Sequence, residues 1–311
     1  MGWKIVHLTK PCKVKVKDSN LLLLFKDNYD EIKITIKDID FILFDNTQFS
    51  ITGKAIELLS KSSIAILFID EEFHPSSILI PYHRHTLLSE VAEIQIKISE
   101  KFKSIVWQNI IKSKISNQAN SLEYFNKPEY EILSDLSNKV KLFDANNDEA
   151  QSARIYWKSL FTNKTFRREQ GSDDIINSML NYSYAILRAT MARSISASGF
   201  LPVFGIWHKN RYNAFNLVDD LIEPFRPVCD IYVKILLNTK FSQSMYLNTL
   251  IKRELVKLLT FECIDIHNGT SNLSKSIEIF VRNYKKAVLK DDISLISYPN
   301  INVEYFKNEF F

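Results

Sequence analysis

The hydrophobic periodicity of the chain changes near residue 84, and this change constrains the fold more than any other feature. Before it, the sequence consists of short apolar or alternating runs, which are typical of β-strands, at residues 3–8, 13–17, 21–25, 32–36, 41–44, 65–69 and 78–80. One stretch differs, because Ala55, Ile56 and Leu59 recur at helical spacing. We therefore expect one short helix, over residues 52–60, within a region of strands.

From Thr86 onward the apolar residues recur with helical spacing. Val91, Ile94, Ile98 and Phe102 fall on one face of a helix, and little strand-like alternation returns before the C-terminus. The second part of the chain is therefore expected to be mainly α-helical.

Proline and polar residues are frequent between positions 74 and 84, as expected for a loop that joins two such units. The sequence thus predicts an α+β fold. In this fold an N-terminal β-rich domain, residues 1–84, precedes a larger, mainly α-helical domain, residues 85–311.

Composition excludes several classes of protein. With 311 residues, 46% of them hydrophobic, the chain can bury a large core. No stretch approaches the roughly 20 apolar residues of a membrane span, and the N-terminus lacks the apolar core of a secretory signal, so we expect a cytoplasmic protein without a membrane partner. The sequence contains neither GxxxxGK[ST] nor GxGxxG, which argues against a P-loop ATPase. Cys12, Cys229 and Cys263 show no CxxC spacing, so neither a disulfide framework nor a zinc ribbon is indicated.

Glu149 lies where residues 144–161 are expected to begin a helix. Asn147 is a suitable N-cap, which places Glu149 in the first turn, near the mouth of a loop. The alternative is that this glutamate only complements the helix dipole and that Arg154 is only a surface cation.

His208 follows an apolar stretch that is broken by Gly199, Pro202 and Gly205. Such a histidine can present a neutral nitrogen to a metal ion or donate a hydrogen bond to a phosphate oxygen. Beside Trp207 it can equally be a hydrogen-bonded packing residue.

Three carboxylates, those of Asp219, Asp220 and Glu223, occupy five positions of otherwise apolar sequence. On a helix Asp220 and Glu223 share a face, and Pro224 restricts the backbone of Glu223 and bends or starts a helix there. Crowded carboxylates repel one another unless a cation neutralises them. The alternative is an acidic helix N-terminus with Arg226 as its counter-charge.

Carboxylates combined with one imidazole suit magnesium or manganese, because hard divalent cations prefer oxygen ligands and keep positions open for water and phosphate. The residues therefore indicate a site for phosphoryl transfer. Neither HExxH nor GxSxG is present, so zinc-protease chemistry and acyl hydrolysis have no comparable support.

Four strings occur in a specific order: Glu149 with Ala-Arg-Ile-Tyr at 153–156, Asn-Ser-Met-Leu-Asn-Tyr-Ser-Tyr at 177–184, Gly-Ile-Trp-His at 205–208, and Asp-Leu-Ile-Glu-Pro-Phe-Arg-Pro at 220–227. In these strings, and in its β-then-α order, the chain resembles the CRISPR-associated integrases, the catalytic subunits of spacer-acquisition complexes in antiviral defence. The resemblance covers essentially the whole chain, and it is to the form that accompanies type II systems.

The resemblance implies that Glu149, His208 and Glu223 are ligands of Mg²⁺ or Mn²⁺ and that Asp220 is a further acidic residue of the catalytic site. One position departs from the family pattern, because Ala150 stands where the family usually has glycine. Alanine is compatible with a helical turn, so this departure leaves the site assignment unchanged.

Basic residues gather in runs along the second part of the chain, and the net charge of +4 permits a polyanionic partner. One such run consists of Lys97, Lys101, Lys103, Lys112 and Lys114. Several runs together favour phosphate contacts, which position a duplex without reading its sequence. The alternative for any one run is a solvated helix face. The residues that we predict to contact DNA are Arg84, Arg154, Arg167, Arg168, Lys209, Arg211, Arg226 and Lys286.

The activity implied by the resemblance is insertion of new spacer DNA into a CRISPR array, by attack of a DNA 3′-hydroxyl on a phosphodiester at the end of a repeat, together with DNA endonuclease activity. The implied partners are double-stranded DNA, a second copy bound through the β domains, a small companion protein and other type II CRISPR proteins. The aromatic tail, residues 305–311, is a candidate contact for the companion, and the alternative is that it packs within the chain.

Two other functions remain open at the level of sequence. One is a structure-specific, metal-dependent DNA nuclease that integrates nothing. The other is a DNA-binding scaffold without catalytic activity, in which the acidic residues are structural.

Overall fold

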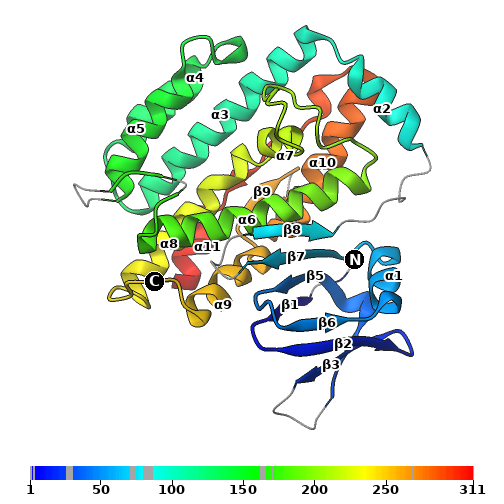
Figure 1. Ribbon diagram of the computed structural model, residues 1–311. Helices are drawn as coiled ribbons and strands as arrows, with labels where there is room; N and C mark the ends of the chain where they lie inside the picture. The colour runs from blue at the N-terminus through cyan, green and yellow to red at the C-terminus, as the bar shows by residue number, and fades with distance from the viewer. Residues whose placement is uncertain are drawn as a thin grey trace.

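The computed structural model describes residues 2, 4–25, 31–70, 75–79, 87–161, 166–169, 171–267 and 269–310. Strands gather in the first part of the chain and helices in the rest, so the predicted α+β fold is confirmed (Figure 1). Two four-stranded sheets lie within Lys4–Leu79. The first has the order β1 (Lys4–Leu8), β5 (Ile39–Phe44), β7 (Ala65–Ile69), β8 (Pro75–Leu79), and the second the order β4 (Ile32–Thr35), β3 (Asn20–Phe25), β2 (Cys12–Lys17), β6 (Phe49–Ile51).

The first sheet is covered on both faces. Its strands β1, β5 and β7 are parallel, and β8 runs antiparallel to β7. Successive side chains of β5 point to opposite faces, so Phe41 and Leu43 join the core of the helical part while Ile42 and Phe44 join a separate core between the two sheets. This burial explains why β5 and β7 are almost entirely apolar in sequence.

Helix α1 (Gly53–Lys61) confirms the short helix expected from sequence. The Thr52 hydroxyl caps it by accepting a hydrogen bond from the Ala55 N–H at 3.3 Å. Strand β6 was not predicted, because its three residues are too few to show a period.

The remaining chain forms the helical part, which the following helices build: α2 (Leu88–Ile96), α3 (Glu100–Tyr124), α4 (Tyr130–Lys139), α5 (Asp148–Leu160), α6 (Ile175–Ala197), α7 (Asn216–Leu221), α8 (Arg226–Thr239), α9 (Thr249–Lys257), α10 (Leu273–Lys290) and α11 (Val303–Phe310). Short 3₁₀ turns are η1 (Ile36–Asp38), η2 (Leu142–Asp144), η3 (Glu223–Phe225), η4 (Leu258–Thr260) and η5 (Ile293–Leu295). Helix α6 lies against β7 and β8, which joins the two parts of the molecule (Figure 1).

A third, antiparallel sheet within the helical part departs from the sequence expectation. Its order is β10 (Gly269–Ser271), β9 (Ile264–Ile266), β11 (Asn300–Ile301). Because no strand in it exceeds three residues, alternation could not reveal it.

The aromatic tail packs within the chain. Phe306 of α11 is fully buried beside Tyr124, and Phe310 lies 5.7 Å from Tyr232 and 5.8 Å from Phe261, measured between ring centroids. These rings are therefore part of the molecule's own core. The structure favours the alternative in which the tail packs within the chain over the one in which it contacts a companion protein.

Strand β8 ends at Leu79 and helix α2 begins at Leu88, and the predicted boundary at residue 84 lies between them, outside the described residues. Arg84, one of the predicted DNA contacts, lies outside them too. Among the described helices, none is long and apolar enough to cross a membrane. The three cysteines are free thiols and buried.

Candidate active site

A cavity of about 910 Å³ lies between strands β7 and β8, helix α6, and the segment from α7 to the start of α8. His208, Glu223, Arg168 and Arg226, four of the residues singled out from sequence, line it. Segments far apart in the chain therefore meet at one opening.

Glu149 lies in the first turn of α5, as predicted, but the cap of this helix differs from the prediction. Asn147 has a left-handed backbone with φ of 57° and makes no capping bond with its side chain. The carboxylate of Asp144 instead accepts hydrogen bonds from the backbone N–H groups of Asp148 at 2.8 Å and Glu149 at 3.1 Å. Asp144 takes over the cap because the turn at Asn147 brings it back over the free N–H groups of the helix end.

Glu223 lies in η3, immediately before α8, which begins at Arg226. The predicted start of a helix after Pro224 is therefore confirmed. Glu223 is buried, and its Oε1 lies 3.1 Å from the Arg226 Nε, so the counter-charge considered from sequence is present.

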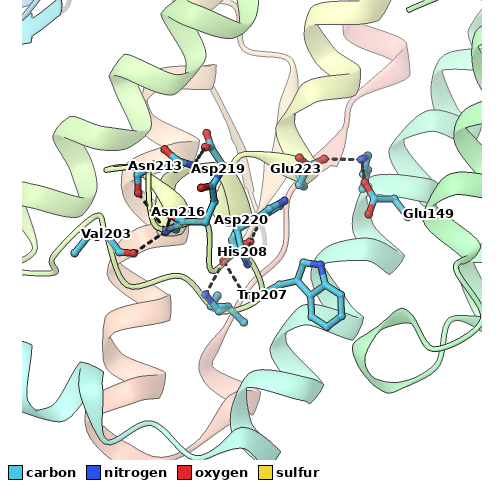
Figure 2. Close-up of polar contacts among 12 residues, drawn as sticks. Glu149, Val203, Trp207, His208, Asn213, Asn216, Asp219, Asp220 and Glu223 are labelled. Carbon is cyan, nitrogen blue, oxygen red and sulfur yellow. Dashed lines mark hydrogen bonds and ion pairs between the residues drawn. The ribbon is translucent and has the colours of Figure 1, made fainter. Parts of the chain in front are cut away.

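Lys114 of α3 joins the two glutamates. Its Nζ lies 2.5 Å from Glu149 Oε1 and 2.5 Å from Glu223 Oε2, and Figure 2 shows the two carboxylates facing each other from different elements. Burial acts to raise the pKa of Glu223, but Arg226 and Lys114 outweigh it and hold that pKa below its ordinary value. Burial acts to lower the pKa of Lys114, but Glu223 and Glu149 outweigh it and raise that pKa.

His208 is oriented by Asp220. The fully buried Asp220 carboxylate accepts hydrogen bonds from the backbone N–H groups of Ile206 at 2.5 Å, Trp207 at 2.9 Å and His208 at 3.2 Å. Its Oδ1 also lies 2.5 Å from His208 Nδ1 (Figure 2). With four donors around it, Asp220 positions His208 and is itself withdrawn from the cavity.

The hydrogen bond to Asp220 raises the pKa of His208 above its ordinary value, against the opposite effect of burial. With Nδ1 held, the other ring nitrogen, Nε2, is hydrogen-bonded by none of the described residues, and the side chain keeps 44% of its surface exposed at the cavity. His208 is therefore oriented so that its Nε2 is available to a ligand in the cavity.

The loop that carries His208 is held by close packing at Gly205. A Cβ atom at Gly205 would lie 2.4 Å from the His208 carbonyl oxygen and 2.8 Å from Asp220 Oδ2, so no larger residue fits. The Trp207 ring stacks on Trp107 of α3 at 5.7 Å between centroids, which fixes the loop against the helix.

Asn216, at the start of α7, ties the same loop together. The Nδ2 atom lies at 3.1, 3.0 and 3.2 Å, within hydrogen-bonding distance, from the carbonyl oxygens of Val203, Asn210 and Asn213 (Figure 2). Asn213 in turn donates to Asp219, which also pairs with Arg188 of α6. The geometry of the loop thus depends on a buried side chain that the sequence pattern did not single out.

Lys114 is the functional residue that sequence reasoning placed differently, as one cation of a basic run on α3. The structure instead buries it between two carboxylates. Asn117, three residues later, donates to the Pro224 carbonyl oxygen at 2.8 Å and anchors α3 against η3. No spacing in the sequence relates these segments, so only the fold reveals the contact.

The other predicted DNA contacts fall into two groups. Arg168 and Arg226 line the cavity and lie over the Tyr184 ring at 5.3 and 5.1 Å. The rest are exposed cations, of which two are on the loop after His208: Lys209, Arg211, Arg154, Arg167 and Lys286. Their contact with DNA stays a prediction.

No group of three His, Cys, Asp or Glu side chains within the described ranges is close enough to hold a metal ion. Of the predicted trio, His208 and Glu223 line the cavity and Glu149 does not, and the three side chains are not closed into a ligand set. The Lys114 ammonium lies between the Glu149 and Glu223 carboxylates.

The chain belongs to the family of CRISPR-associated protein Cas1, whose family model matches residues 6–257. The resemblance inferred from the four strings is thereby confirmed. The protein called "CRISPR-associated endonuclease Cas1" from Neisseria meningitidis serogroup C is 31% identical over 302 residues, which cover 97% of each chain.

Solved structures share the fold. A casposase bound to integration product has a TM-score of 0.77 and 22% sequence identity, covering 93% of this chain and 91% of that one. A chain of a Cas6-RT-Cas1–Cas2 complex has a TM-score of 0.73 and 17% identity, covering 94% of this chain and 36% of that chain.

Proposed function

We propose that the chain is a metal-dependent DNA integrase that inserts new spacer DNA into a CRISPR array. The observation that supports this most is the meeting of Glu149 and Glu223 on one buried cation, close to an imidazole whose Nδ1 is held by Asp220. The relatives agree with it, because one is named an endonuclease and another is bound to an integration product.

In this proposal Glu149, Glu223 and His208 hold Mg²⁺ or Mn²⁺. The kinds of donor suit such an ion, since two carboxylates that already share one cation and an imidazole nitrogen are ligands that Mg²⁺ and Mn²⁺ accept. Binding would bring the three side chains closer together than they lie in this structure. When bound, the ion neutralises charge on the phosphodiester and lowers the pKa of the attacking DNA 3′-hydroxyl.

The protein's own residues orient the metal-binding imidazole and bind the phosphate. Asp220 keeps His208 in the tautomer with its proton on Nδ1, so that Nε2 faces the cavity. Arg168 and Arg226 supply positive charge on the cavity wall, where a phosphate oxygen would accept their hydrogen bonds. Transesterification then joins the 3′-hydroxyl to the repeat-end phosphodiester without a covalent protein intermediate, and the leaving 3′-hydroxyl carries away the proton that the attacking one releases.

The proposed partners are double-stranded DNA, a second copy of the chain and a small companion protein of the acquisition complex in a type II system. A spacer has two ends, so two active sites held at a fixed separation are needed. The Cas1–Cas2 complex among the structural neighbours supports the companion.

Strand joining tests the proposal. The protein and its companion are incubated with a short duplex, a supercoiled plasmid that contains a repeat, and Mg²⁺ or Mn²⁺. Glu149→Gln, His208→Ala and Glu223→Gln should each lower covalent joining about 100-fold or more, because each removes one ligand, while duplex binding is retained. Glu123→Gln, an exposed acid on α3, is the matched control and should join normally.

The outcomes separate the alternatives. Nicked plasmid without any joined product would favour the nuclease that integrates nothing. Full activity of all three variants would favour the scaffold with structural acidic groups and would refute the site assignment.

A further inference from the structure

Lys114 is almost enclosed where the two glutamates meet. Its side chain is 11% exposed, and the Glu149 and Glu223 oxygens nearest to its Nζ come from α5 and η3, which are separate elements. Among the described residues no hydrogen bond joins the two carboxylates directly, so the ammonium is what links them.

The charges around this ammonium balance. Glu149 and Glu223 carry two negative charges, and Lys114 and Arg226 carry two positive ones. Two carboxylates this close repel each other, and burying either one without a counter-charge is costly. A divalent cation placed between the same oxygens would add two positive charges to a balanced group, so it and the ammonium cannot share that space.

We propose that Lys114 is the resident counter-ion of the metal-free site, which holds Glu149 and Glu223 together and competes with the divalent cation for them. Metal binding is then an exchange of one cation for another, and the site stays assembled without metal. This inference rests on the proposed function, because it takes the two glutamates to be metal ligands.

Competition predicts that removing the ammonium strengthens metal binding. Lys114→Met keeps the length and apolar stem of the side chain and removes its charge. Lys112→Met is the matched control, since Lys112 is on the same helix, is partly exposed, and forms no ion pair with a described residue. Titration calorimetry with Mn²⁺ alone, without DNA, should give a Kd on the order of tenfold lower for Lys114→Met than for wild type and Lys112→Met.

Thermal unfolding supplies the second measurement. Without metal, Lys114→Met should unfold at a lower temperature than Lys112→Met, because its two carboxylates are unbalanced, and Mn²⁺ should raise its midpoint more than that of wild type. The double variant Lys114→Met/Glu149→Gln restores the balance of charge. It should recover metal-free stability relative to Lys114→Met and lose the response to Mn²⁺.

The results that overturn the inference are distinct from those that overturn the proposed function. Mn²⁺ binding that is unchanged or weaker in Lys114→Met overturns the competition alone. A double variant no more stable than Lys114→Met shows that Lys114 acts through packing and overturns the inference even where Lys114→Met itself does not fold. If neither wild type nor Lys114→Met binds Mn²⁺, the metal site of the proposed function fails as well.

Discussion

At the scale of single residues, the most informative feature of the site is that Asp220 and Glu223 make different kinds of contact. The two carboxylates are three positions apart in sequence and both are buried. Asp220 is saturated by three backbone N–H groups and the His208 ring, whereas Glu223 is held by the side chains of Lys114 and Arg226. The first carboxylate positions a histidine, and the second pairs with two cationic side chains.

Asp220→Asn should therefore lower strand joining about 10- to 100-fold, since the amide NH₂ would face N–H donors and His208 would lose its orientation. The expected effect on duplex binding is small. Joining assays and gel shifts measure the two separately, with Asp291→Asn as the control because asparagine adopts the left-handed backbone at that position readily. Normal joining by Asp220→Asn would show that His208 does not need this partner.

At the scale of elements, three helices behind the cavity meet at Asp230 of α8. Asp230 accepts hydrogen bonds from the hydroxyl of Tyr156 of α5 at 3.0 Å and from that of Tyr184 of α6. Burial raises the pKa of Asp230 to about 7, although the two hydroxyl groups act to lower it. The contact therefore ties the helices together and makes their stability depend on pH.

The sign of this pH dependence follows from the linkage between proton binding and folding. The folded chain holds the Asp230 proton more tightly than the unfolded chain, whose aspartate pKa is about 3.9, so folding stability falls as pH rises from about 4 to about 7. Asp230→Asn has no proton to lose. Urea unfolding should show that its stability relative to wild type increases across this window, by on the order of a few kcal/mol. Parallel stability curves for the two proteins would refute the assignment.

At the scale of the whole molecule, two buried ion pairs connect the strands to the helices. Arg193 of α6 donates to Asp40 of β5 at 2.6 Å, and Lys252 of α9 donates to Asp45, next to β5, at 2.7 Å. The core that contains Phe41 also continues from the first sheet into the helices. We therefore expect the β part and the helical part to unfold together.

Asp45→Ala should destabilise the chain by roughly 3–5 kcal/mol, because the buried Lys252 ammonium would lose the carboxylate that lies 2.7 Å from it. Asp38→Ala breaks the half-exposed pair with Lys4 and should cost about 0–1 kcal/mol. Chemical denaturation followed by circular dichroism and by tryptophan fluorescence measures both. Two separate transitions, or equal costs for the two variants, would contradict this connection.

Much of the fold was predictable because it depends on local pattern. The change of period near residue 84, the short helix after Thr52 and the start of α8 behind Pro224 each follow from side-chain spacing or backbone restriction. The elements that were missed, such as β6 and the third sheet, are too short to have a period.

The sequence by itself also determined the family and named Glu149, His208 and Glu223, because ordered strings and residue types are visible in one dimension. Only the tertiary structure decided how these residues act. In the structure Asp220 lies outside the cavity, and Asp144 rather than Asn147 caps helix α5. Lys114, which the sequence placed in a basic run, lies 2.5 Å from two glutamates. The physical reason is that a hydrogen bond or an ion pair depends on distances set by packing. The sequence does not show the distance between residues that are 35 or more positions apart, as Lys114 and Glu149 are.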